Sequence, residues 1–308
     1  ESSVTIDGVR LVIDSGLSRQ LRFDPNTGME GLETVPSSQA SADQRRGRAG
    51  RQGPGQCIRL WSPAEQHRRP SFSPPELQLA DPQPVLMELA QWGAGLGDAL
   101  PWLDPPPQAA LMEGRQHLMG LGILTPSGTL SAVGRQLTGL GVHPRLGLLM
   151  LEAKRQGQTR LGCDLATILS ERDPLSISEV GCDLQLRLQA LQEHRRLGSL
   201  RDRSRQLQRQ VDRIKLEPAD EAIKLDAAEL VLCAFPEWLA LARPGQTGRF
   251  LLRQGRGAAL RDGDALASAE ALAVARVDTG QRNTHIQLAL PISRKRVVAL
   301  AHRHGCWT

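Results

Sequence analysis

The residues that most constrain this chain are Ser41 to Arg51, which read SADQRRGRAGR. Ser41 followed by Gln44 fits the capping box, in which a serine and a glutamine cap each other's backbone N–H groups at a helix start. The pattern therefore predicts that a helix begins at Ser41. Gln44, Arg48 and Arg51 stand at positions i, i+4 and i+7, so we expect them on one face of that helix.

Two glycines, Gly47 and Gly50, interrupt this predicted helix. Each costs roughly 1 kcal/mol relative to alanine inside a helix, which indicates that something approaches the backbone closely. Guanidinium groups beside such a surface suit a polyphosphate, because arginine keeps its charge and offers a planar fork of donors. The alternative is a solvated basic helix. The glycine spacing and the aligned glutamine favour the phosphate-binding interpretation.

The same residues carry a family resemblance. Gln44 to Arg51 resembles the last conserved motif of superfamily 2 helicases, in the form of the DEAH-box group, and Thr5 to Gly16 resembles the motif that precedes it. Three later segments are similar to the winged-helix region of the same proteins: residues 103–107, 133–135 and 137–145. The order and separations agree over about the first 150 residues, and the details are most similar to the bacterial HrpB branch.

The resemblance implies roles for the residues of the arginine motif. Gln44, Arg48 and Arg51 would be the catalytic and ATP-binding residues, facing the γ-phosphate across the cleft between two lobes. Gln44 would orient the attacking water. Arg48 and Arg51 would stabilise charge on the transferred phosphoryl group, a role worth about 10³–10⁵ in rate in related nucleotidases. Arg45 and Arg46 are expected to be structural or salt-bridged.

The upstream motif has implied roles as well. Asp7 would lie near the nucleotide ribose, and Thr5 would couple the nucleotide state to the nucleic-acid track. The alternative for Asp7 and Gly8 is a plain turn before a buried strand at residues 9–13, which form a short run rich in β-branched residues.

Two helicase motifs do not occur in this sequence. It contains neither a G-x-x-x-x-G-K-[ST] phosphate loop nor Asp-Glu-x-His. In the family these lie in a first RecA-like lobe, which would also hold the ligands of the Mg²⁺ that accompanies ATP. We therefore expect the C-terminal part of a longer helicase, which by itself does not hydrolyse ATP because the main electrostatic parts of phosphoryl transfer are elsewhere.

The predicted function is that of a C-terminal part of an ATP-dependent RNA helicase. The intact protein would couple ATP hydrolysis to 3′-to-5′ translocation, with single-stranded RNA (or DNA) and the missing N-terminal RecA-like lobe as partners. The alternative is a non-catalytic RNA-binding or regulatory module derived from helicase C-terminal domains.

Composition is compatible with an anionic partner without requiring one. The formal net charge is +5, and arginine supplies nearly all of the positive charge. Genome base content explains such a bias equally well. Five scattered cysteines without a C-x-x-C pair indicate a reducing cytoplasm and no metal site. No apolar run is long enough to span a bilayer, so no membrane is expected.

The expected fold is multidomain, with an α/β part followed by helical and β-rich parts. Residues 1–67 are predicted to be the C-terminal part of a second RecA-like lobe, with a hairpin that turns at residues 24–28 and a last strand at residues 56–61. Residues 68–141 are predicted to be a winged-helix domain, with helices at residues 85–92 and after Pro107, a wing at residues 123–130 and a helix at residues 132–140.

The second half is predicted from periodicity. Residues 142–235 should form a helical domain in which Asp164 and Asp183 are candidate helix caps, and the family resemblance implies that it is ratchet-like. Its run of seven arginines and a lysine between Arg195 and Lys215 either lines a nucleic-acid channel or forms a solvated helix. Residues 236–308 should form a small β-rich domain, because residues 284–292 alternate like a strand. The resemblance to DEAH-box helicases implies that this domain is OB-like.

Overall fold

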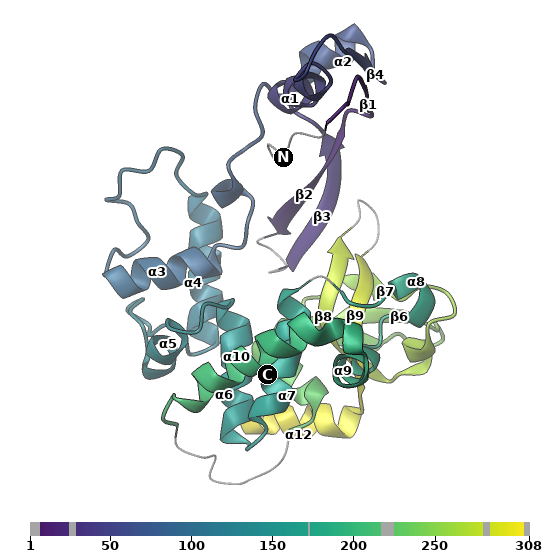
Figure 1. The fold of residues 1–308 in the computed structure, drawn as a ribbon. Coiled ribbons are helices and arrows are strands. Elements are labelled where there is room, and N and C mark those ends of the chain that lie inside the picture. The colour runs from purple at the N-terminus through teal and green to yellow at the C-terminus, as the bar shows by residue number, and fades with distance from the viewer. Residues whose placement is uncertain (1–6, 25–28, 172, 217–224, 280–283, 305–308) are drawn as a thin grey trace.

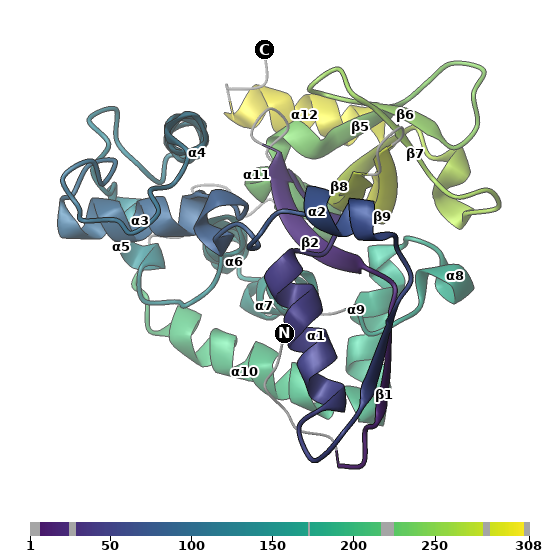
Figure 2. The same cartoon turned by 90° about the horizontal axis from the view of Figure 1, so that it is seen from above.

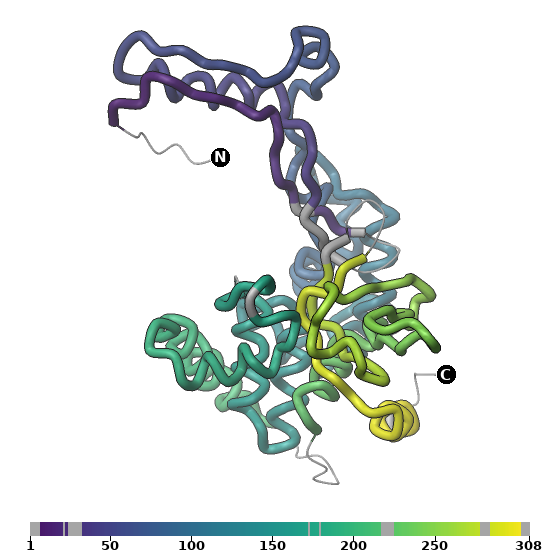
Figure 3. The backbone as a smooth tube through the Cα atoms, turned by 90° about the vertical axis from the view of Figure 1, so that its right-hand side faces the viewer, coloured from purple at the N-terminus to yellow at the C-terminus, as the bar shows by residue number. Residues whose placement is uncertain are grey.

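The computed structural model describes residues 7–24, 29–171, 173–216, 225–279 and 284–304. An N-terminal arm, residues 7–70, extends from a larger body that contains the helices and a barrel (Figures 1 and 3). The hairpin of the arm reaches down to the barrel, and its second strand contacts a barrel strand. The mixed helical and sheet content agrees with the prediction of α/β, helical and β-rich parts.

The arm is built on a small parallel sheet. Strand β1 (Leu11–Asp14) pairs with β4 (Gln56–Arg59), and helix α1 (Gln39–Ala49) packs against both strands. The strand expected at residues 9–13 is present but begins two residues later, at Leu11. The prediction that it is buried is wrong. Leu11 is 50% exposed and Ile13 is 62% exposed, because no described element covers the face of the sheet that carries them.

The predicted hairpin is confirmed. Strand β2 (Leu17–Asp24) pairs antiparallel with β3 (Met29–Pro36), and most of its expected turn, residues 25–28, lies outside the described residues. Helix α2 (Pro63–Arg68) and a 3₁₀ turn, η1 (Glu76–Gln78), then lead back to the body.

Three helices follow η1 in the chain. These are α3 (Gln83–Trp92), α4 (Gln108–Gly120) and α5 (Ala132–Leu137), close to the predicted positions. Pro107 precedes α4, as the prolines predicted. At residues 123–130, where a wing was predicted, one antiparallel bridge joins Leu124 and Leu130 around a turn, in which the backbone N–H of Thr125 donates to the carbonyl of Thr129 at 2.9 Å.

The helical region is confirmed over the described part of residues 144–234. Helices α6, α7 and α10 pack together (Figure 1), and α11 packs against α6. The helices are α6 (Pro144–Arg155), α7 (Thr159–Ser170), α8 (Ile177–Val180), α9 (Leu184–Glu193), η2 (Arg195–Leu197), α10 (Gly198–Asp212) and α11 (Ala227–Ala234).

The two predicted caps have different outcomes. The Asp183 carboxylate accepts from the backbone N–H of Gln185 and caps α9, as predicted. Asp164 is no cap, because it lies inside α7, buried against α10, where its carboxylate accepts a 2.5 Å hydrogen bond from the Ser204 hydroxyl. Both aspartates stand in the same four-residue sequence, Gly-Cys-Asp-Leu, so the local pattern does not distinguish them. Helix α7, however, begins five residues before Asp164.

The buried Asp164 makes stability depend on pH. Burial raises the pKa of its carboxyl above the ordinary 3.8, and the Ser204 hydrogen bond and Arg160 oppose part of this rise. The native state therefore holds the proton more tightly than the unfolded chain, so stability is lost as the pH rises from about 3.8 through the raised native pKa.

We expect Asp164→Asn to raise the unfolding midpoint at pH 7, because asparagine still accepts from Ser204 without burying a charge. The gain should vanish below about pH 3.8, as followed by thermal unfolding across the pH range. Asp202→Asn, at an exposed carboxylate on α10, is the control that should show no such gain. A variant of Asp164 that is less stable at pH 7 would contradict the argument.

The C-terminal part is a closed five-stranded barrel in the order β5-β6-β7-β9-β8. The β7–β9 pair is parallel and the other pairs are antiparallel. Helix α11 packs on β8 and β9, which joins the helical and barrel cores. The elements are η3 (Pro236–Trp238), β5 (Leu239–Ala242), β6 (Arg249–Leu252), β7 (Gly257–Ala259), η4 (Ala265–Ser268), β8 (Ala271–Thr279), β9 (Thr284–Ile292) and α12 (Arg294–His304).

Candidate functional site

Helix α1, which carries the arginine motif, begins earlier than predicted. It starts at Gln39, and the Ser38 hydroxyl caps it by accepting from the backbone N–H of Ser41 at 3.1 Å. The predicted start at Ser41 is therefore wrong. Ser38 has the extended backbone of an N-cap, whereas Ser41 already lies in the first turn, so its side chain cannot serve that role.

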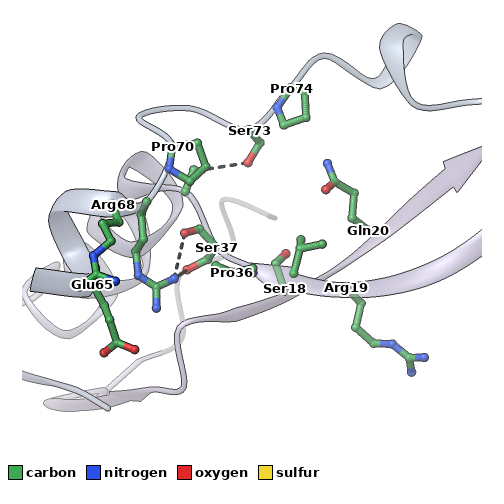
Figure 4. Close-up of a pocket in the computed structure, with 13 residues that line it drawn as sticks. Ser18, Arg19, Gln20, Pro36, Ser37, Glu65, Arg68, Pro70, Ser73 and Pro74 are labelled. Carbon is green, nitrogen blue, oxygen red and sulfur yellow. Dashed lines mark hydrogen bonds between the residues drawn. The ribbon is translucent and has the colours of Figure 1, made fainter. Parts of the chain in front are cut away.

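The base of the hairpin holds this first turn in place. A cavity of about 510 Å³ lies between the hairpin, α2 and the loop that follows it (Figure 4). In its wall the Arg69 guanidinium donates to the carbonyls of Gly16 at 2.7 Å and Ser37 at 3.0 Å, and it stacks on Trp61. These contacts fix the chain just before the cap, so α1 keeps one orientation relative to the hairpin.

Arg45 joins α1 to the end of β1. Its guanidinium lies 2.9 Å from a carboxylate oxygen of buried Asp14 and donates to the carbonyl of Leu17. The same oxygen of Asp14 accepts from the backbone N–H of Gly16, which shapes the turn after β1. Arg46 lies 3.6 Å from Asp43. The prediction that Arg45 and Arg46 are structural or salt-bridged is confirmed.

Arg48 lies at the carboxyl end of β1, where ligands commonly bind in α/β sheets. It is half-buried and, with Arg45, lines an open cavity of about 360 Å³ whose other wall is residues 12–15. Gln44 is exposed one turn earlier on α1. The predicted pairing of Gln44 and Arg48 on one helical face therefore agrees with the structure.

Arg51 lies outside the helix. Helix α1 ends at Ala49, Gly50 is its C-cap, and Arg51 lies exposed in the bend that follows. The predicted i+7 position is wrong because the helix stops before it. A methyl group added at Gly47 or Gly50 would meet nothing within 4 Å, so packing within the described chain does not require these glycines.

Asp7 lies beside the end of the arginine motif. Its carboxylate accepts a hydrogen bond from the Gln52 side chain, and the Gln52 amide oxygen accepts from the backbone N–H of Gly8 at 3.0 Å. Gly8 has a φ of +78°, so the turn predicted as the alternative is present. Thr5 lies outside the described residues. Sequence reasoning missed Gln52, because a pairing across more than forty residues leaves no local pattern.

No group of three or more histidine, cysteine, aspartate or glutamate side chains among the described residues is placed to hold a metal ion. Within the same residues, no helix has the length and apolar character needed to cross a membrane.

Comparison with known proteins places these features in context. No protein-family model matches the chain. It is 36% identical over 270 residues to the ATP-dependent RNA helicase HrpB of Escherichia coli, a match covering 88% of this chain and 32% of that protein. It is 37% identical to the ATP-dependent RNA helicase HrpA of the same organism, over 56% of this chain and 14% of the relative.

Solved structures give the same result. A crystal structure of the E. coli DEAH/RHA helicase HrpB matches with a TM-score of 0.83 at 34% identity, covering 96% of this chain and 36% of that one. A second crystal structure, of the E. coli DExH-box NTPase HrpB, matches with a TM-score of 0.80 over 98% of this chain. This chain thus spans about a third of the length of these HrpB proteins.

Proposed function

We infer that this chain belongs to the DEAH-box RNA helicases and is part of a protein of the HrpB type. The similarity of nearly the whole chain to HrpB, in sequence and in fold, is the observation that carries this inference. The protein that contains the chain would couple ATP hydrolysis to translocation along RNA and to unwinding. The chain would be the C-terminal part of that protein.

We propose that α1 presents the arginine side of the ATP site. Gln44 would orient the attacking water, and Arg48 would stabilise charge on the phosphoryl group as it is transferred. Support comes from Arg48 at the carboxyl end of β1, beside an open cavity, with its neighbour Arg45 held by Asp14. Arg51 would reach the phosphates from the bend after α1.

The donors around this cavity fit phosphate oxygens and not Mg²⁺. Arg45 and Arg48 are cations, and the Arg45 guanidinium already contacts the nearby Asp14 carboxylate. The ligands of the Mg²⁺ that accompanies ATP are therefore expected in the first RecA-like lobe. Asp7 would lie near the ribose, held by Gln52, and Thr5 would couple the nucleotide state to the RNA track.

We propose the following domains. Residues 1–67 belong to the second RecA-like lobe, 68–141 to a winged-helix domain, 142–235 to a ratchet-like helical domain, and 236–308 to an OB-like domain. The last assignment is supported by the order β5-β6-β7-β9-β8 with its parallel β7–β9 pair, as in a five-stranded Greek-key barrel.

The test is ATP turnover by the full-length protein with and without single-stranded RNA. A helicase of this kind is expected to turn over ATP faster when RNA is present. RNA binding without any ATP turnover would contradict the proposal and favour a non-catalytic RNA-binding or regulatory module.

A further inference from the structure

The segment between Arg69 and Arg115 differs in charge from the rest of the chain. It contains six aspartate or glutamate residues and no lysine, arginine or histidine, whereas the whole sequence carries 38 lysine and arginine residues and a net charge of +5. Helix α3, the loop 93–107 and the start of α4 belong to this segment. In Figures 1 and 2 these elements lie at one edge of the molecule, away from the barrel and from α1.

Two large apolar side chains are exposed at this edge. Trp92, the last residue of α3, is 70% exposed, and Leu103, in the loop that follows, is 97% exposed. The Trp102 indole N–H donates to the carbonyl of Gly97 at 2.8 Å, and a methyl group added at Gly97 would lie 3.2 Å from Leu89. Because Leu89 lies one turn before Trp92 on α3, these contacts hold Leu103 beside the end of the helix that carries Trp92.

Three exposed carboxylates flank the two apolar side chains. Glu88 lies one turn before Trp92 on α3, whereas Asp98 and Asp104 lie in the loop, the second of them next to Leu103. None of the three carboxylates has an ion-pair or hydrogen-bond partner within the part of the chain that the structure describes. These five residues form what we call the acidic apolar surface. Its charge favours a cationic partner and disfavours an anionic one.

We propose that the acidic apolar surface binds a basic amphipathic helix of a partner protein. Apolar side chains of that helix would cover Trp92 and Leu103, and its lysine or arginine side chains would lie beside the carboxylates. A helix suits this surface because it presents apolar and charged side chains together along one face. Exposed tryptophan is a frequent anchor of protein interfaces, and opposite charges at the rim select the partner.

The loop is already ordered for such an interface. Its backbone is closed by hydrogen bonds from the N–H of Gly97 to the carbonyl of Ala94 at 2.9 Å and from the N–H of Leu100 to the carbonyl of Gly97 at 3.0 Å. Binding therefore costs little additional ordering of the chain. Nucleic acid does not fit the same surface, because contacts to a phosphate backbone depend on lysine and arginine, which this segment lacks.

The experiment is fluorescence anisotropy with the full-length protein and a labelled helical peptide of about 18 residues, or five turns, with leucine along one face and lysine beside it. Trp92→Ala should weaken peptide binding about 30-fold or more, the loss expected when an interface anchor is truncated. Phe72→Ala is the matched control. It removes an aromatic side chain that is 76% exposed outside the acidic apolar surface, so it should bind the peptide as the wild type does.

Reversing the charge tests the choice of partner. A variant with both Asp98→Lys and Asp104→Lys should bind the lysine peptide weakly and should gain affinity for a peptide in which glutamate replaces lysine. Glu193→Lys, at an exposed position at the end of α9, is the control that should leave both affinities nearly unchanged. All of these side chains are exposed, so thermal unfolding of the variants should match that of the wild type.

Four results would overturn the proposal. The first is no binding of the lysine peptide by the wild-type protein, and the second is equal affinity for the lysine and glutamate peptides. The third is loss of affinity for single-stranded RNA in Trp92→Ala, which would assign the surface to nucleic acid. The fourth is self-association that the double charge reversal abolishes, which would make a second copy of the protein the occupant. Neither ATP nor RNA enters this recognition, so failure of the helicase proposal would leave it unaffected.

Discussion

Replacing Arg48 with alanine in the full-length protein should lower the rate of RNA-stimulated ATP hydrolysis by about 10³-fold or more, the range for removal of an arginine finger. The reason is electrostatic, because the guanidinium would act on charge that develops only during phosphoryl transfer. The turnover number should therefore fall much more than the affinity for ATP. Steady-state kinetics of ATP hydrolysis at saturating RNA separate the two quantities.

The chain offers a matched control on the same helix. Arg46 is exposed, and its nearest acidic partner in the structure is Asp43, at 3.6 Å, so Arg46→Ala removes an arginine from α1 without touching the Arg48 cavity. We expect that variant to keep most of the turnover. Similar losses in the two variants would indicate a general effect of charge or folding, and unchanged turnover in Arg48→Ala would remove the residue from the ATP site.

The second large effect should come from Arg145→Ala, which is expected to lower the free energy of unfolding by about 3–5 kcal/mol, as for a broken buried ion pair. Arg145 is 2% exposed, yet its guanidinium donates to Gln83 at 3.1 Å and to the carbonyl of Ala234 at 3.0 Å. It also pairs with Glu237 and lies 5.4 Å from the ring of Phe235. One side chain thus joins α3, α6 and α11.

Denaturant unfolding measures this effect. Arg155→Ala is the control, since that arginine lies at the other end of α6. Its guanidinium is 3.9 Å from Glu152, which makes a long, partly exposed ion pair. It should cost less than about 1 kcal/mol. An equally small cost at Arg145 would mean that the three helices are held together without its contacts.

Helix α1 shows which features of the site can be predicted from the sequence. The spacing of Gln44 and Arg48 is a local property, and the structure keeps both on one helical face. The ends of the helix depend on which side-chain hydroxyl accepts from the free backbone N–H groups of the first turn, and on which residue takes the C-cap position. Ser38 and Gly50 decide them, so the predicted start at Ser41 and the helical position of Arg51 are both wrong.

Local side-chain patterns were sufficient to predict the periodic elements and the motifs. The hairpin, the helices after the prolines and the alternation of the last barrel strand follow from side-chain spacing, which is set by local geometry. Tertiary structure alone decided burial and long-range partners. It buried Asp164 where α7 meets α10, left Ile13 exposed and buried Arg145 among three helices. The physical reason is that burial and pairing depend on residues far apart in the chain, which no local pattern encodes.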